Sequence, residues 1–233
     1  LKQITLAIAF LMALTTSVFS QDFNKGLAAA QTGDFATALQ EWRPLAEQGD
    51  ASAQFNLALM YRKGNGVLQD DAEAAKWYLR AAEQGNASAQ NNLGLMYRKG
   101  NGVLQDDAEA AKWYLRAAEQ GNASAQNNLG LMYRKGNGVL QDDAEAVKWF
   151  RMAAEQGDAQ AQTNLGFMYH YGKGVLKDNT MAHMWYNIGS ANGNDLGAEN
   201  REIVAKEMTS EDISKATALA RECMSSNYQK CGY

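Results

Sequence analysis

Apolar residues recur with helical spacing through most of the chain, and one stretch shows the pattern clearly. Within residues 87–99, four residues at positions i, i+4, i+7 and i+8 share one helical face: Ala89, Leu93, Met96 and Tyr97. Asn86 precedes the stretch as a possible N-cap, and Gly100 follows it as a stop. The pattern predicts a helix over residues 87–99.

A second helix is predicted over residues 107–120. Asp106 and Glu109 have the spacing of a capping box at its start, and Gly121 ends it. The inward face of this helix carries Ala111, Tyr114, Ala117 and Ala118. The small residues Gly94, Ala111 and Ala118 allow the two helices to approach closely. Between them, Gly100-Asn101-Gly102 forms a turn, so the two helices make a hairpin.

This pattern repeats with a period of 36 residues. Residues 71–106 recur without change as residues 107–142, and looser copies occupy 35–70 and 143–178. A fixed period of this length is typical of a solenoid, in which each unit buries its apolar face against its neighbours. We therefore predict an all-α fold, a right-handed α/α solenoid of stacked helix-turn-helix repeats of 36 residues.

The repeated residues carry a family resemblance. The pattern A-x-x-x-L-G-x-M-Y-x-x-G-x-G-V-x-x-D, followed by A-x-x-W-Y-x-x-A-A-E-x-G, resembles the Sel-one-like repeat, a relative of the tetratricopeptide repeat. Ala58 departs from it by replacing the usual glycine. The resemblance implies a repeat array over residues 35–193. We expect residues 21–34 to supply the first helix of an opening hairpin, and residues 194–233 to supply capping helices.

The first twenty residues differ from the rest. Lys2 precedes an apolar run, and small residues follow it, so residues 1–20 have the pattern of a signal peptide cut before Gln21. An uncleaved anchor or a buried helix is the alternative. We expect the mature protein to be periplasmic or secreted, without an integral membrane span.

Two cysteines stand near the C-terminus, Cys223 and Cys231. An even count in an exported chain favours one disulfide, which would hold the end of the array together. Two free thiols are the alternative.

Signatures of catalysis are scarce. The chain has no G-x-S-x-G, no H-E-x-x-H and no P-loop, and its two histidines, His170 and His183, fall in different predicted helices. The Gly-x-Gly turns recur once per unit, which favours a role in linking helices over phosphate binding. We expect no cofactor and no metal.

The resemblance suggests one enzymatic alternative, a cell-wall-active protein that binds penicillin or resembles a β-lactamase. The relatives concerned carry a cysteine pair in each repeat, whereas these repeats hold none, and no serine here begins an S-x-x-K motif.

The resemblance also implies that the first helix of each unit lines a concave groove. Registering the units on Leu-Gly-x-x-Tyr gives four outward positions in each: Phe55, Leu59, Arg62 and Lys63; Asn91, Leu95, Arg98 and Lys99; Asn127, Leu131, Arg134 and Lys135; Thr163, Phe167, His170 and Tyr171. The groove would have an apolar floor beside repeated Arg-Lys pairs, although those pairs also suit a helix C-terminus.

The sequence thus favours a monomeric, non-catalytic scaffold that binds another protein or peptide segment. The groove cations predict a partner with acidic and apolar residues. The formal net charge of −4 gives no reason to expect nucleic acid as a partner.

Overall fold

The computed structural model describes residues 22–232, which form twelve helices and no strand. The predicted signal peptide, residues 1–20, lies outside the described residues. The helices are α1 (Phe23–Gln31), α2 (Phe35–Glu47), α3 (Ala51–Lys63), α4 (Asp71–Glu83), α5 (Ala87–Lys99), α6 (Asp107–Glu119), α7 (Ala123–Lys135), α8 (Asp143–Ala154), α9 (Ala159–Tyr171), α10 (Asn179–Ala191), α11 (Asp195–Ala205) and α12 (Ser210–Ser225).

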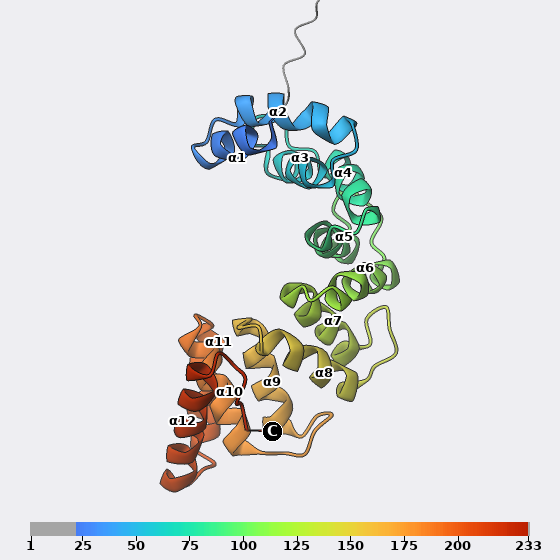
Figure 1. Cartoon of the computed structure of the whole chain (residues 1–233). Coiled ribbons are helices and arrows are strands. Elements are labelled where there is room, and N and C mark those ends of the chain that lie inside the picture. Colours follow the sequence, from blue (N-terminus) through green and yellow to red (C-terminus); the bar gives the residue numbers. More distant parts are fainter. Residues whose placement is uncertain (1–21, 233) are drawn as a thin grey trace, which may run out of the picture.

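The helices are stacked in an arc that opens to the left in Figure 1. Helices α1 and α2 stand at one end, and α11 and α12 stand at the other. Between them, α3 to α10 form four hairpins, each packed on the next. In each hairpin we call α3, α5, α7 or α9 the first helix and α4, α6, α8 or α10 the second. The predicted all-α solenoid is confirmed.

Every one of these twelve helices begins at a side-chain cap. An Asp, Asn or Thr at each N-cap accepts a hydrogen bond from a backbone N–H in the first turn. The helix predicted over 87–99 has the observed bounds of α5. The second predicted helix ends one residue earlier, at Glu119. The first of the predicted capping helices, α11, ends at Ala205.

The predicted capping box is only half formed. Asp106 Oδ1 accepts a bond from the Glu109 backbone N–H at 2.9 Å. The Glu109 side chain does not return to the Asp106 N–H, which donates to the carbonyl of Tyr97 instead. Glu109 pairs with Lys112 at 2.8 Å, one turn further along α6. A carbonyl in the last turn of α5 therefore satisfies the donor that a complete capping box would have used.

Two glycines of each inner unit permit close packing. A Cβ on Gly94 would lie 2.9 Å from the ring of Tyr114, so the absence of a side chain lets α5 meet α6. Gly102 has a φ of +68°, and a Cβ there would collide with the backbone carbonyl of Asp71 at the start of α4. The Gly-x-Gly turn, predicted to link two helices, thus also packs against the preceding unit.

A ladder of buried glutamines ties each hairpin to the one before it. The Gln126 side chain donates to the carbonyl of Ala118 at 3.1 Å and accepts from the Gln156 side chain at 2.7 Å. The same two bonds recur around Gln54, Gln90 and Gln162. Because the glutamines are buried, each bond satisfies a polar group that water cannot reach.

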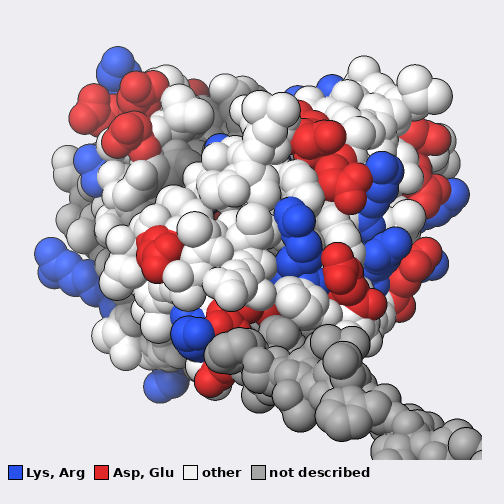
Figure 2. Space-filling view, turned by 90° about the horizontal axis from the view of Figure 1, so that it is seen from above, with Lys and Arg blue, Asp and Glu red and all other residues white. Residues whose placement is uncertain are grey.

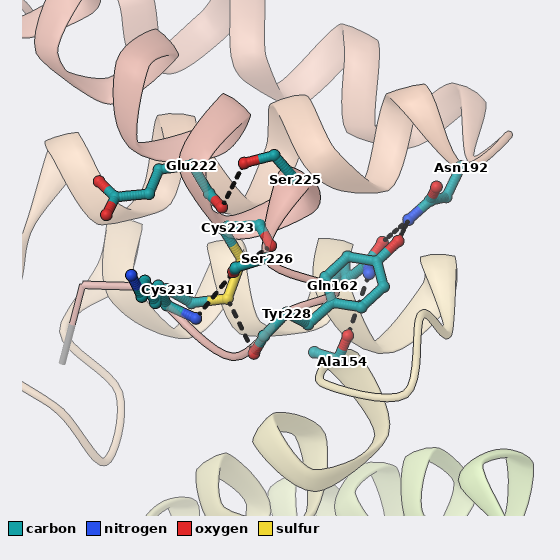
Figure 3. Close-up of a disulfide and its surroundings, with 10 residues drawn as sticks. Ala154, Gln162, Asn192, Glu222, Cys223, Ser225, Ser226, Tyr228 and Cys231 are labelled. Carbon is teal, nitrogen blue, oxygen red and sulfur yellow. Dashed lines mark hydrogen bonds between the residues drawn. A yellow bond between two sulfur atoms is a disulfide. The ribbon is translucent and has the colours of Figure 1, made fainter.

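The ladder ends at the C-terminal tail (Figure 3). There Asn192 takes the place of the second glutamine and donates to both Gln162 and the hydroxyl of Tyr228, each at 2.8 Å. The predicted disulfide joins Cys223 of α12 to Cys231, with their Cα atoms 4.4 Å apart. Both cysteines are buried, so the disulfide belongs to the core of the C-terminal end.

Candidate protein-binding surface

The sixteen predicted groove residues do not all face solvent. Lys63, Lys99, Lys135 and Tyr171 are exposed, and nine are half-buried: Phe55, Leu59, Arg62, Asn91, Leu95, Arg98, Leu131, Arg134 and Phe167. The prediction of outward side chains was wrong for the remaining three. Asn127, Thr163 and His170 are 7%, 6% and 5% exposed. They belong to the packing between units.

Asn127 and its counterpart Asn91 bond to the next unit, whereas the buried Thr163 bonds within its own helix. Asn127 accepts a bond from Asn164 at 2.8 Å, and Asn91 accepts one from Asn128 at 3.1 Å. Thr163 donates to the carbonyl of Ala159 within α9. These asparagines form a second ladder on the first helices, and part of their hydrogen-bonding capacity is used within the fold.

At the first junction this ladder is different. Phe55 stands where the next unit has Asn91, so it offers no amide to the following helix. There Asn92 accepts a hydrogen bond from the Arg62 guanidinium at 2.7 Å. In the next unit Asn128 turns to Asn91, and Arg98 forms no hydrogen bond or ion pair with any residue in the range 22–232. The first two units, which differ at Phe55 and Asn91, therefore hold their arginines differently.

The third arginine is also engaged within the fold. The Arg134 guanidinium lies 5.0 Å from the centroid of the Phe167 ring, a cation–π contact. Partial burial lowers the pKa of Arg134, with the nearby Asp143 opposing the shift. Of the three arginines, Arg98 is thus the one whose guanidinium has no hydrogen bond, ion pair or ring contact with a described residue.

Lysines on the two kinds of helix differ in their partners. On the second helices Lys76, Lys112 and Lys148 each pair with a glutamate three residues earlier, at 2.9, 2.8 and 3.2 Å. On the first helices Lys63, Lys99 and Lys135 form no ion pair with a described residue. The array thus neutralises its outer lysines and leaves cations without acidic partners on the first helices.

Two hollows lie beside these cations. Pocket I, of about 350 Å³, is lined from one unit by Arg62, Gln69 and Asp71, and from the next by Leu95, Met96, Lys99 and Asn101. Pocket II, of about 400 Å³, has the equivalent lining one repeat later: Arg98, Leu131, Met132, Lys135 and Asn137. Each pocket combines an arginine of one unit with a lysine of the next.

Part of the lining of these pockets was not predicted from the sequence. Gln69 and Asp71 follow the turn of one unit, and Asn101 and Asn137 lie within the turns. Their recurrence every 36 residues beside the Gly-x-Gly turn was the available signal. We placed the groove on helices alone, whereas turn residues complete it.

A row of leucines was also unassigned. Leu68, Leu104, Leu140 and Leu176 occupy the same position in successive turns, and each is about nine-tenths exposed. They are a second apolar surface, separate from the two pockets.

Charge at the N-terminal end of the arc is mixed. Viewed from the α1–α2 end, acidic and basic side chains are interspersed with neutral ones (Figure 2). Within residues 22–232, no three His, Cys, Asp or Glu side chains gather in a way that would hold a metal ion. In the same range, no helix is long and apolar enough to cross a membrane.

Solved structures similar to this chain share its repeats. A protective antigen of uropathogenic Escherichia coli, described as displaying an SLR fold, is 36% identical with a TM-score of 0.82, covering 88% of this chain. This chain spans 46% of that antigen. A Sel1 repeat protein from Oxalobacter formigenes is 27% identical with a TM-score of 0.72, over 87% of this chain and 100% of the other.

A putative Sel1 repeat protein from Klebsiella pneumoniae is 25% identical, with a TM-score of 0.51 over 78% of this chain and 91% of the other. Comparison with curated proteins gave no significant match. The family model of the Sel1 repeat matches residues 51–86, 87–122, 123–158 and 159–194, which are the four hairpins α3–α4 to α9–α10. The chain therefore belongs to the Sel1 repeat family.

Proposed function

We propose that this protein is a non-catalytic scaffold that binds an acidic, partly apolar segment of another protein on its first helices. Proteins of the Sel1 repeat family are generally protein-interaction scaffolds. The observation that carries the proposal is a contrast between two sets of lysines. Those of the second helices form ion pairs, whereas those of the first helices pair with no carboxylate among residues 22–232. Charged groups without an internal partner are available to complement a partner of opposite charge.

Apolar contact supports the same surface. Leu59, Leu95 and Leu131 are half-buried on the first helices. Leu95 lines pocket I and Leu131 lines pocket II, each beside the cations. A segment that carries only acids would leave these leucines without a matching contact. We therefore infer a partner with both acidic and apolar side chains.

We infer that the protein acts outside the cytoplasm, in the periplasm or after secretion, as a monomer. The disulfide between Cys223 and Cys231 supports this location, because disulfides persist in oxidising compartments. No observation on the described residues favours the penicillin-binding alternative. Labelling the purified protein with a fluorescent penicillin tests that alternative directly.

The test compares two matched triple variants in capture of a partner from envelope extract. The first neutralises the first-helix lysines through Lys63→Gln, Lys99→Gln and Lys135→Gln. The second makes the same charge change at Lys76, Lys112 and Lys148. We expect the first variant to lose the partner and the second to keep it, with capture by the unmodified protein weakening as salt rises. Equal loss in both variants would place the interaction elsewhere.

A further inference from the structure

The C-terminal end of the array shows how a carboxylate can sit at the junction between units. Glu207, which follows α11, accepts bonds from His170 Nε2 at 3.3 Å, Lys177 Nζ at 3.3 Å and Asn179 Nδ2 at 3.2 Å. These bonds, that of Asn179 foremost, lower the pKa of Glu207. The carboxylate is thus held by one unit while its own backbone belongs to the next segment.

The three groups that hold Glu207 have counterparts in pocket I. Moving back by three repeat lengths converts His170, Lys177 and Asn179 into Arg62, Gln69 and Asp71. These are the residues that the first unit contributes to pocket I. Pocket I therefore occupies the place in its junction that the Glu207 carboxylate occupies at the end of the array.

The counterpart of Glu207 itself reverses the charge. Helix α11 begins one repeat length after α9, and Glu207 falls two repeat lengths after Lys135 and three after Lys99. At the C-terminal end a carboxylate meets a histidine and a lysine. In the inner junctions a lysine meets an arginine, Arg62 with Lys99 and Arg98 with Lys135. The like charges of each inner junction leave the anion to be supplied from outside.

The acids near the pockets do not cancel this excess. Asp71 lines pocket I and gives one carboxylate for two cations. Its counterpart Asp107 has a buried Oδ1 that accepts no hydrogen bond from a described residue. Arg98 and Lys135 of pocket II have no ion pair with a described residue. Both pockets keep a net positive charge beside an aliphatic wall, Leu95 or Leu131.

We propose that pockets I and II each bind one carboxylate of the partner, between the arginine of one unit and the lysine of the next. The bound segment then carries two acidic side chains one repeat apart, and their methylene groups contact the leucines. This inference rests on the proposed function and names the contacts of that surface. It assigns no such role to Arg134, which contacts Phe167, because the following unit has Tyr171 where the others have a lysine.

The test uses fluorescein-labelled hexaglutamate as the probe, with hexaglutamine as the uncharged control, and measures fluorescence anisotropy with the full chain. The paired variant Lys99→Gln with Lys135→Gln removes one cation from each pocket without touching the bond between Arg62 and Asn92. The matched control is Lys76→Gln with Lys112→Gln. We expect the pocket variant to lose about tenfold in affinity for hexaglutamate and the control less than about twofold.

A second variant separates loss of binding from loss of structure. Lys135→Glu gives pocket II the residue type that stands at position 207. Its carboxylate should pair with Arg98, so hexaglutamate should bind more weakly than with Lys135→Gln, while the melting temperature stays the same or rises. A melting temperature that falls sharply would show that a carboxylate does not fit this place, and the inference would be wrong.

Other results of the same experiment also test the carboxylate pockets. Equal losses in the pocket and control variants, or equal affinity for hexaglutamate and hexaglutamine, overturn the carboxylate pockets. If the envelope partner still depends on the first-helix lysines in that case, the scaffold function stands and only its contacts are reassigned. If neither the partner nor the probe depends on them, both proposals are wrong.

Discussion

In the two identical units, Asp71–Asp106 and Asp107–Asp142, the first helices present cations that no described carboxylate neutralises. At the C-terminal end, residues of the chain itself contact the equivalent positions. Glu207 supplies an acid, Tyr228 completes the glutamine ladder, and a disulfide joins the tail to α12. The end of a solenoid must therefore satisfy, within the chain, the charged and hydrogen-bonding groups that an inner unit can leave for a partner.

The largest expected effect concerns packing. Trp185 in α10 is 0% exposed, whereas its counterpart two repeats earlier, Trp113, is 5% exposed. Helices α9, α11 and α12 all pack on α10. We expect Trp185→Ala to lower the free energy of unfolding by about 3–5 kcal/mol, and Trp113→Ala to lower it less. Denaturant unfolding followed by circular dichroism measures both, and equal losses would mean that the C-terminal end is packed no better than the inner units.

The next effect concerns the disulfide. Cys223 and Cys231 are eight residues apart, and chain entropy for so short a loop gives about 2–3 kcal/mol. We expect the double variant Cys223→Ala with Cys231→Ala to speed amide hydrogen exchange in α12 and the tail. Exchange in α3 to α6 should stay unchanged, because each unit contacts only its neighbours. A uniform increase along the array would contradict this local role, and reduction of the unmodified protein provides a second measurement.

The smallest effect is expected at Glu207, which is only partly shielded from solvent. Because its pKa is lowered in the folded chain, its stabilising contribution is fully present above the ordinary glutamate pKa of about 4.3. That contribution is lost as the pH falls through the lowered value. We expect the segment after α11 to loosen on acidification in the unmodified protein, and Glu207→Gln to remove this pH dependence.

Hydrogen exchange as a function of pH checks this expectation. Glu202→Gln on α11 is the matched control, since Glu202 is exposed and forms no hydrogen bond with a described residue. The same acid response in the unmodified protein and in Glu207→Gln would show that Glu207 does not fasten this end.

Much of the fold was predictable because its determinants are local. Caps and glycines set the bounds of α5 to the residue, and repetition identified the solenoid. The C-terminal disulfide followed from two cysteines. The predicted capping box was incomplete because other residues bind its groups. Lys112 forms an ion pair with Glu109, and the carbonyl of Tyr97 accepts the N–H of Asp106.

The candidate site was less predictable, because its residues depend on the next unit. Asn91 and Asn127 have identical surroundings in sequence up to the end of the copied segment, yet Asn91 is half-buried and Asn127 is buried. The first downstream difference between the two contexts is Ala111 in α6 against Val147 in α8, so the nearby sequence does not distinguish the two asparagines. The buried glutamine ladder was missed because its partners are distant in sequence. A glutamine in each first helix gives no sign that one partner lies on the preceding helix and the other just after the following one.

The glutamine ladder has a consequence for the number of units. Each rung links the same positions in every hairpin, and the copies 71–106 and 107–142 are identical. Excising one copy therefore rejoins the chain at a junction whose two faces already exist in the protein. The arc becomes shorter by one hairpin, and the unit after Arg98 then carries Phe167 and Tyr171, as the unit after Arg134 does now. Reach and valency are thus set by copy number, which gene duplication or deletion alters without any new interface having to evolve.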